Sequence, residues 1–181
     1  MTRITERDAT CRVFTFKEGL LSAMAHDLEI DVARFSIEWP EDVSRVTAEM
    51  DAGSLRVLHA VHDGTPAPSA LSERDRRKIE QNIGADVLHV TRHPTVRFEA
   101  NVSWKGGQPT VEGELALAGR SRPVHVEVSE EAGALVARAT LHQPDFGIAP
   151  YSAMLGVLRI KPDVKVEVRV PRSRLPPPPA P

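Results

Sequence analysis

The chain has 181 residues and a mass of 19.9 kDa, the size of one ordinary globular domain and small for two. Its 23 Lys and Arg residues nearly balance 25 Asp and Glu residues, and the resulting net charge of -2 excludes a chain-wide basic field for binding nucleic acid or an anionic membrane. Aromatic residues are only 4% of the chain, which argues against the stacking surfaces of single-stranded nucleic-acid binders and predicts a core of Val, Leu, Ile and Ala.

The beginning of the chain carries charged side chains throughout, so it lacks the continuous apolar segment of a signal peptide. No run of about 18 apolar residues occurs anywhere, which excludes a transmembrane helix. The single cysteine, Cys11, cannot form a disulfide within the chain. We therefore expect a cytoplasmic protein that does not span a membrane.

Alternation of apolar and polar side chains, the pattern of strands with one buried face, recurs along most of the chain. In chain order it covers residues 28–32, 46–50, 96–104, 110–118, 124–128, 135–141 and 164–170. Gly106 and Gly107 separate two of these segments and predict a hairpin. The pattern predicts an all-β fold of about eight antiparallel strands, the number at which a sheet can close into a small barrel.

One stretch breaks the alternation and predicts a helix over about residues 73–83. Ser72 can cap its N-terminus, and acidic residues follow in the first turn. Ile79 and Ile83 form a narrow apolar stripe, and Gly84 can end the helix. Because the stripe is narrow, we expect this helix to lie against the outside or the mouth of the barrel.

The end of the chain differs in composition from the rest. Six of the fifteen prolines fall in the last eleven residues. We therefore expect a barrel domain over residues 1–171 and a disordered, proline-rich tail over residues 172–181 outside it.

Several segments resemble the YceI-like family, bacterial polyisoprenoid-binding barrels with a lipocalin-like shape. Residues 72–100 resemble that family's helix and the extended strand after it, with His93 where an aromatic residue is usual. Residues 113–128, GELALAGRSRPVHVEV, resemble its most specific hairpin, and residues 139–150, ATLHQPDFGIAP, resemble a third segment. Residues 14–35 keep its opening hairpin in outline, yet AHDLEI resembles a less studied subgroup without signal peptides. The resemblance implies a lipocalin-like barrel that holds a long isoprenoid chain, such as an isoprenoid quinone.

An eight-stranded barrel either fills with its own side chains or holds a small ligand, and alternation alone does not decide between them. On the ligand hypothesis, we expect the wall to include apolar residues of the alternating segments, with one histidine at the head group. The candidate ligand-binding residues are Phe14, Phe16, His26, Leu28, Ile30, Val96, Phe98, Leu115, Leu117, Phe146 and Ile148. Each buried methylene contributes about 0.8 kcal/mol, so several prenyl units would bind without any polar contact.

His26 and Asp27 form the most suggestive polar pair, at the start of an apolar strand. A histidine beside a carboxylate can bond a ligand head group or titrate near neutral pH. Adjacent strand residues point to opposite faces, however, so the two share one site only if they lie in a turn. The alternative is a structural histidine.

The remaining histidines do not predict a metal site. His59 and His62 lie close in sequence, as do His89 and His93. In an extended strand the latter two are about 13 Å apart, too far to share one ion. The chain also has no nucleophile elbow, phosphate-binding loop or zinc-protease motif, so we predict no catalytic residues, no metal and no enzyme activity.

The sequence therefore predicts a non-catalytic binding or carrier protein for an amphiphile with a long apolar chain: an isoprenoid, an isoprenoid quinone or a fatty acyl group. Beyond that bound ligand, no cofactor is expected. The alternative is a protein interaction module with a filled barrel core. A continuous apolar void of several hundred Å³ would favour the first hypothesis. The oligomeric state is open, with a dimer plausible.

Overall fold

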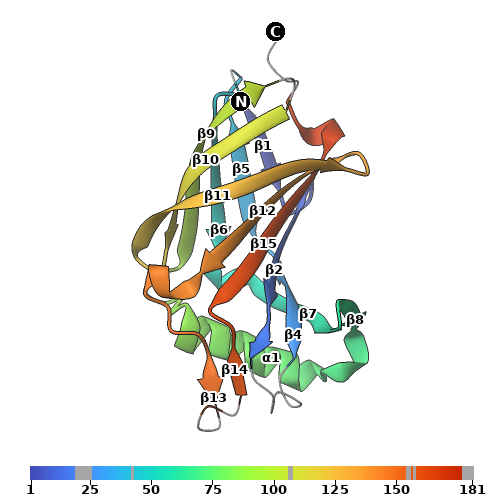
Figure 1. The fold of residues 1–181 in the computed structure, drawn as a ribbon, viewed down its shortest axis with the longest axis vertical. Coiled ribbons are helices and arrows are strands. Elements are labelled where there is room, and N and C mark those ends of the chain that lie inside the picture. The colour runs from blue at the N-terminus through green and yellow to red at the C-terminus, as the bar shows by residue number, and fades with distance from the viewer. Residues whose placement is uncertain (19–25, 42, 106–107, 154–155, 157, 177–181) are drawn as a thin grey trace.

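The computed structural model describes residues 1–18, 26–41, 43–105, 108–153, 156 and 158–176. Its main element is a strongly curled antiparallel sheet of twelve strands (Figure 1). In chain order these strands are β1 (Thr2–Thr5), β2 (Thr10–Thr15), β4 (Asp27–Val32), β5 (Phe35–Trp39), β6 (Arg45–Asp51), β7 (Leu55–His62), β8 (Thr65–Ala67), β9 (Thr95–Lys105), β10 (Gln108–Leu117), β11 (Arg120–Glu131), β12 (Ala134–His142) and β15 (Asp163–Pro171). A smaller sheet joins β3 (Lys17–Glu18), β13 (Ser152–Ala153) and β14 (Leu158–Ile160).

Three long strands bend sharply, and each is divided into two successive elements: β1 and β2, β4 and β5, β6 and β7. The first halves and second halves pair separately, β1 with β5 and β5 with β6 on one side of the bend, β2 with β4 and β4 with β7 on the other. At the sides of this bent group, β2 pairs with β15 and β6 pairs with β9. The predicted all-β antiparallel barrel is confirmed, and the strand count exceeds about eight because the bends divide these strands.

The chain from β9 to β12 is a continuous meander of hairpins. β9 and β10 form the predicted hairpin, whose expected turn glycines at 106–107 lie outside the described residues. The next two hairpins turn at Ala118–Gly119 and Ala132–Gly133, and all four residues have positive φ. Such two-residue turns match the right-handed twist of the strands they join, so the meander curls steadily round the barrel.

The helix α1 (Glu73–Asn82) begins at the predicted cap. The Ser72 hydroxyl accepts a hydrogen bond from the Asp75 backbone N–H at 3.1 Å. In return the Asp75 carboxylate accepts one from the Ser72 backbone N–H at 3.2 Å, which completes a capping box. These bonds satisfy two backbone donors that the first helical turn would otherwise leave unpaired.

The helical backbone does not stop at Gly84 as predicted. A π-helical turn, Ile83–Val87, follows α1 directly, and Gly84 is not among the residues with positive φ. Val87 and Leu88 pack against a core cluster that includes Leu115, and this packing explains the extra turn. Among the described residues, no helix is long and apolar enough to cross a membrane.

The chain stays in contact with the barrel beyond the expected domain end at residue 171. A 3-10 turn, Arg172–Arg174, follows β15, and Leu175 packs against the largest core cluster. Arg174 also forms an ion pair with Asp8 at 3.3 Å. Residues 172–175 of the expected tail therefore contact the barrel, and residues 177–181 lie outside the described residues.

Candidate functional site: an apolar cavity in the barrel

The barrel contains a cavity of about 640 Å³. Its wall is formed by alternate residues of the strands, because successive side chains of a strand point to opposite faces of the sheet. On β15 the wall residues are Val164, Val166, Val168 and Val170. On β12 they are Leu135, Ala137, Ala139 and Leu141. This regular alternation makes most of the wall apolar.

Helix α1 lies across one end of the barrel, as Figure 1 shows at its lower end. Ile79 and Ile83, the predicted apolar stripe, both line the cavity. They pack with Leu71 against a cluster that contains Leu28 and Ile30 of β4. The helix therefore lies at the mouth of the barrel, one of the two positions expected, and its apolar side becomes part of the cavity wall.

The opposite end of the cavity is filled by packed side chains. Trp39 lines the cavity at the end of β5, where it pairs with Thr2 next to the N-terminus. Val43 is buried there although its φ of 48° is left-handed, and its carbonyl accepts a hydrogen bond from Trp104 Nε1 at 3.3 Å. A valine in this conformation is strained, so the surrounding core must hold it in place.

Most of the predicted ligand-binding residues line this one cavity. These are His26, Leu28, Ile30, Val96, Phe98, Leu115, Leu117 and Ile148. Phe146 is buried beside them, in the cluster with Leu115 and Ile148, but it does not line the cavity. Contact of these residues with a ligand stays a prediction.

Phe14 and Phe16 do not lie where the sequence analysis placed them. The cavity-lining residues of β2 are Val13 and Thr15, so Phe14 points to the opposite face of the strand. Phe16 directly follows β2 and does not line the cavity either. Phe16 instead lies under the ammonium group of Lys165, 5.7 Å from its ring centroid. Alternation alone does not say which face of a strand is buried, and the ladder register with β4 and β15 places Val13 and Thr15 inside.

Two sets of wall residues were not assigned to the wall from the sequence, although their patterns were visible in it. The valines of β15 alternate without interruption, yet only earlier strands were assigned to the wall. The stripe of Ile79 and Ile83 was predicted to lie against the outside or the mouth of the barrel, but was not included in the cavity wall. Their roles depend on which elements face each other across the interior, and this is not visible in a local pattern.

His26 and Asp27 point to different places, as adjacent strand residues do. His26 lines the cavity near its helix end, whereas Asp27 Oδ1 accepts the backbone N–H of Lys17 at 2.7 Å. At the same end Asn82 Nδ2 donates a hydrogen bond to the Tyr151 hydroxyl at 3.0 Å, and both residues line the cavity. Polar groups from three separate segments therefore meet at the mouth.

Two of the other histidines lie beside separate acidic residues. His59 Nε2 lies 2.9 Å from Glu29 Oε2, and the ring of His62 lies 3.7 Å from Asp63. Across the described residues, no group of three or more His, Cys, Asp or Glu side chains could hold a metal ion. Burial raises the pKa of the Cys11 thiol to about 12, even beside Arg12, so the reactive thiolate form is suppressed.

The segments that resemble the YceI-like family meet in space. The ring of His93 lies against Gly119, where a β-carbon would come within 2.9 Å of it. The guanidinium of Arg120 lies against Gly147 in the same way, at 2.8 Å from the position of a β-carbon. Both glycines have positive φ. The motif residues are therefore explained by close packing between a hairpin turn and its neighbours.

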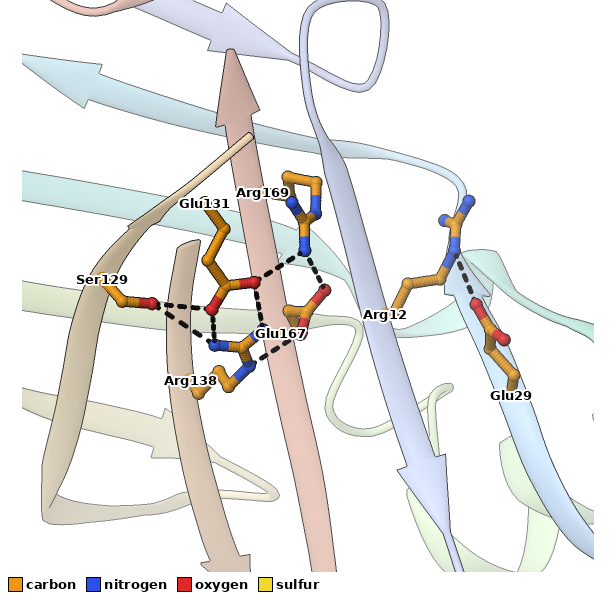
Figure 2. A network of polar contacts seen from close by, with 7 residues as sticks. All are labelled: Arg12, Glu29, Ser129, Glu131, Arg138, Glu167 and Arg169. Carbon is orange, nitrogen blue, oxygen red and sulfur yellow. Dashed lines mark hydrogen bonds and ion pairs between the residues drawn. The ribbon is translucent and has the colours of Figure 1, made fainter. Parts of the chain in front are cut away.

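A network of charged side chains covers part of the barrel away from the mouth (Figure 2). Arg138 donates to Glu131 through Nη1 at 2.5 Å and to Glu167 through Nε at 2.8 Å. Arg169 and Ser129 also donate to Glu131, at 3.3 Å and 2.9 Å. Hydrogen bonds from Arg138, and then from Ser129, lower the pKa of Glu131 from 4.5 to about 2, and the same contacts raise the pKa of Arg138 further.

The ladder register extends this network into a row of alternating charge across six strands. From β11 to β7, the residues opposite one another are Glu127, Arg138, Glu167, Arg12, Asp31 and Arg56. Opposite charges directly across a ladder stabilise the pairing, and like charges would oppose it. The row thus favours this register and balances its own charge.

An antiparallel barrel with an apolar interior cavity and a helix across its mouth is a lipocalin-like barrel. The chain belongs to the YceI-like family, since its residues 8–171 match the YceI-like domain. None of the curated proteins compared with the chain matches it.

Solved structures show the same fold at low sequence identity. BcnA of Burkholderia cenocepacia is 13% identical with a TM-score of 0.54, covering 88% of this chain and 94% of that one. A polyisoprenoid-binding domain of Saccharophagus degradans, implicated in plant cell wall breakdown, is 10% identical with a TM-score of 0.57, covering 90% and 91%. The YceI protein of Campylobacter jejuni is 10% identical with a TM-score of 0.52, covering 79% and 82%.

Proposed function

We propose that this protein is a non-catalytic binding or carrier protein for an amphiphile whose long apolar chain lies in the barrel. The observation that carries this proposal is the apolar cavity of about 640 Å³, which falls within the range of about 300–1,000 Å³ typical of small-molecule sites. A wall of alternating Val, Leu and Ile residues favours a hydrocarbon chain because each buried methylene contributes about 0.8 kcal/mol. An isoprenoid, an isoprenoid quinone or a fatty acyl chain has this chemistry.

The fold relatives support a binding role. A structure with the same fold is a polyisoprenoid-binding domain, at 10% identity. The alternative, a protein interaction module, requires a barrel core filled by its own side chains. The cavity is the feature that favours the carrier over this alternative.

The proposal is tested by recovering the ligand. Organic extraction of protein purified from its native host, followed by mass spectrometry, should release an isoprenoid or fatty chain in near-stoichiometric amount. Phe98→Asp should abolish this recovery, because Phe98 lines the cavity and an unpaired buried carboxylate costs several kcal/mol and attracts water.

The matched control is Asn101→Asp on the same strand. Asn101 is exposed and lies between Arg45 of β6 and Glu112 of β10 in the ladder, so the new carboxylate stays in water outside the cavity. This variant should retain the ligand. Native protein that yields no lipid, and binds neither isoprenoids nor fatty acids when they are added, would reject the carrier and favour the interaction module.

A further inference from the structure

Polar side chains are unevenly distributed around the cavity. Several gather at its helix end: His26 before β4, Lys78 and Asn82 on α1, and Tyr151 before β13. Asn82 and Tyr151 are joined by the 3.0 Å hydrogen bond, which places the end of α1 beside the chain that follows β12. Lys78 is four residues before Asn82 and therefore lies on the same side of the helix.

Two other polar wall residues, Thr15 and Trp39, have buried Oγ1 and Nε1 atoms without a hydrogen-bond partner among the described residues, and three more are already engaged. Asp51 accepts two hydrogen bonds from the Arg34 guanidinium, at 2.9 Å and 2.6 Å. Arg138 is bound to the carboxylates of the outer network, and Gln143 Nε2 donates to the carbonyls of Lys161 and Pro162, each at 3.2 Å. The side chains of Asp51, Arg138 and Gln143 thus have hydrogen-bond partners within the protein and do not require a ligand to provide them.

Asp75, an acidic wall residue on α1, is also engaged. The Asp75 carboxylate accepts one hydrogen bond from the Ser72 hydroxyl at 2.6 Å and another from the Ser72 backbone N–H at 3.2 Å. The hydrogen bond from the hydroxyl is the main reason that the pKa of Asp75 is lowered. Its charge therefore serves the helix N-terminus, where an anion is favoured by the helix dipole.

Lys78 is left as a cation without a partner in the part of the chain that the structure describes. Its neighbours on α1 differ in this respect. Arg77 is ion-paired with Glu73, and Arg76 donates to the Leu58 carbonyl at 3.2 Å. The ammonium group of Lys78, with three donors, is the charged group at the cavity mouth that remains available.

Two further side chains that line the cavity can donate hydrogen bonds. Because the Tyr151 hydroxyl accepts the bond from Asn82, its own proton remains to be donated. His26 is half-buried and has no hydrogen bond or ion pair to another described residue. The cavity lining therefore offers an ammonium group, a hydroxyl and an imidazole as hydrogen-bond donors for an oxygen-bearing group.

We propose that the helix end of the cavity binds an anionic head group, a carboxylate or a phosphate, with Lys78 as its charge partner and Tyr151 and His26 as additional donors. This rests on the proposed function, since it names the head group of the ligand whose chain fills the barrel. Charge-assisted hydrogen bonds are about twice as strong as neutral ones. An acid should therefore bind about tenfold more tightly than a neutral alcohol with the same chain.

The experiment compares three ligands with one chain: oleate, oleyl phosphate and oleyl alcohol. Each displaces a neutral fluorescent probe, N-phenyl-1-naphthylamine, from the full-length protein. Lys78→Met keeps the apolar stem and removes the charge, and it should weaken binding of the anionic ligands about tenfold while oleyl alcohol changes less than twofold. Tyr151→Phe should show the same selectivity with a smaller loss. Comparing oleate with oleyl phosphate identifies which anion is preferred.

Arg77→Met is the matched control, because it removes a cation of the same helix that is already paired with Glu73. It should leave all three affinities within twofold. Equal binding of oleate and oleyl alcohol by the unmodified protein, or a parallel loss of both in Lys78→Met, would overturn the head-group proposal alone. Failure of all three ligands to bind would reject the proposed function, and the head-group proposal with it.

Discussion

At Gly113 two strands of the barrel come too close for a side chain. A β-carbon there would lie 2.5 Å from Phe98 Cζ and 2.6 Å from Ala100 Cβ, both on the neighbouring strand β9. The Phe98 ring thus occupies the space above the glycine and is held at the cavity wall by it. One glycine therefore determines the position of the largest wall residue of β9 that the sequence analysis identified.

Replacing Gly113 with Ala should destabilise the protein by about 1–3 kcal/mol, because the methyl group must displace Phe98 or separate the strands. Chemical denaturation measures this change. The control is Gly84→Ala in the π-helical turn, where the nearest atom to a new β-carbon is 3.5 Å away, an ordinary contact. That variant should instead raise the free energy of unfolding by about 0.4–1 kcal/mol. A neutral Gly113→Ala would show that the Phe98 ring is not fixed at this site.

At the scale of elements, seven strands of the larger sheet were predictable because each has one buried face and so alternates locally, whereas β1, β2, β5, β7 and β8 were not among the alternating segments. The bends were not predictable. For example, the chain bends between β4 and β5 at Ala33–Arg34, and neither residue is of a type that is typical of turns. The start of the helix was predictable from Ser72. The π-helical turn that continues past Gly84 was not, because it depends on packing against strands distant in the sequence. Likewise Phe14 was assigned to the wrong face, because face assignment requires the register of both neighbouring strands.

The network around Arg138 makes acid stability depend on Glu131, whose carboxylate accepts hydrogen bonds from both Arg138 and Arg169. Its folded pKa of about 2 is below its ordinary value of 4.5, so its contribution to stability is complete above pH 4.5 and is lost as pH falls toward 2. We therefore expect Glu131→Gln to lower the unfolding midpoint at pH 7, and the difference from the unmodified protein to shrink between pH 4.5 and pH 2. Thermal unfolding across this pH range measures it.

Glu130→Gln is the control for this prediction. Glu130 is exposed on the same strand and has no ion pair among the described residues. Its variant should track the unmodified protein at every pH. A Glu131→Gln difference that stays constant down to pH 2 would mean that the network around Arg138 does not form in solution.

For the whole molecule, the cavity links stability to occupancy. A ligand present at one hundred times its Kd stabilises the folded state by about 2.7 kcal/mol. For a chain of this length that corresponds to a rise in melting temperature of roughly 5–10 °C. The empty barrel, in contrast, lacks the dispersion contacts that close packing would supply along its inner wall. A larger side chain in the cavity should therefore stabilise the ligand-free protein and reduce the stabilisation that a bound ligand provides.

Ala139→Phe places a ring in the cavity from β12, where Ala139 is half-buried in the wall. We expect the melting temperature of the ligand-free variant to equal or exceed that of the unmodified protein. We expect saturating oleate to raise the melting temperature of the variant by less than about half of the rise seen in the unmodified protein. Thr140→Phe adds the same ring to the exposed face of the same strand and should leave the oleate shift unchanged. A full oleate shift in Ala139→Phe would place the ligand outside the barrel. A large loss of stability without ligand would show that the wall around Ala139 is already closely packed, as the interaction-module hypothesis requires.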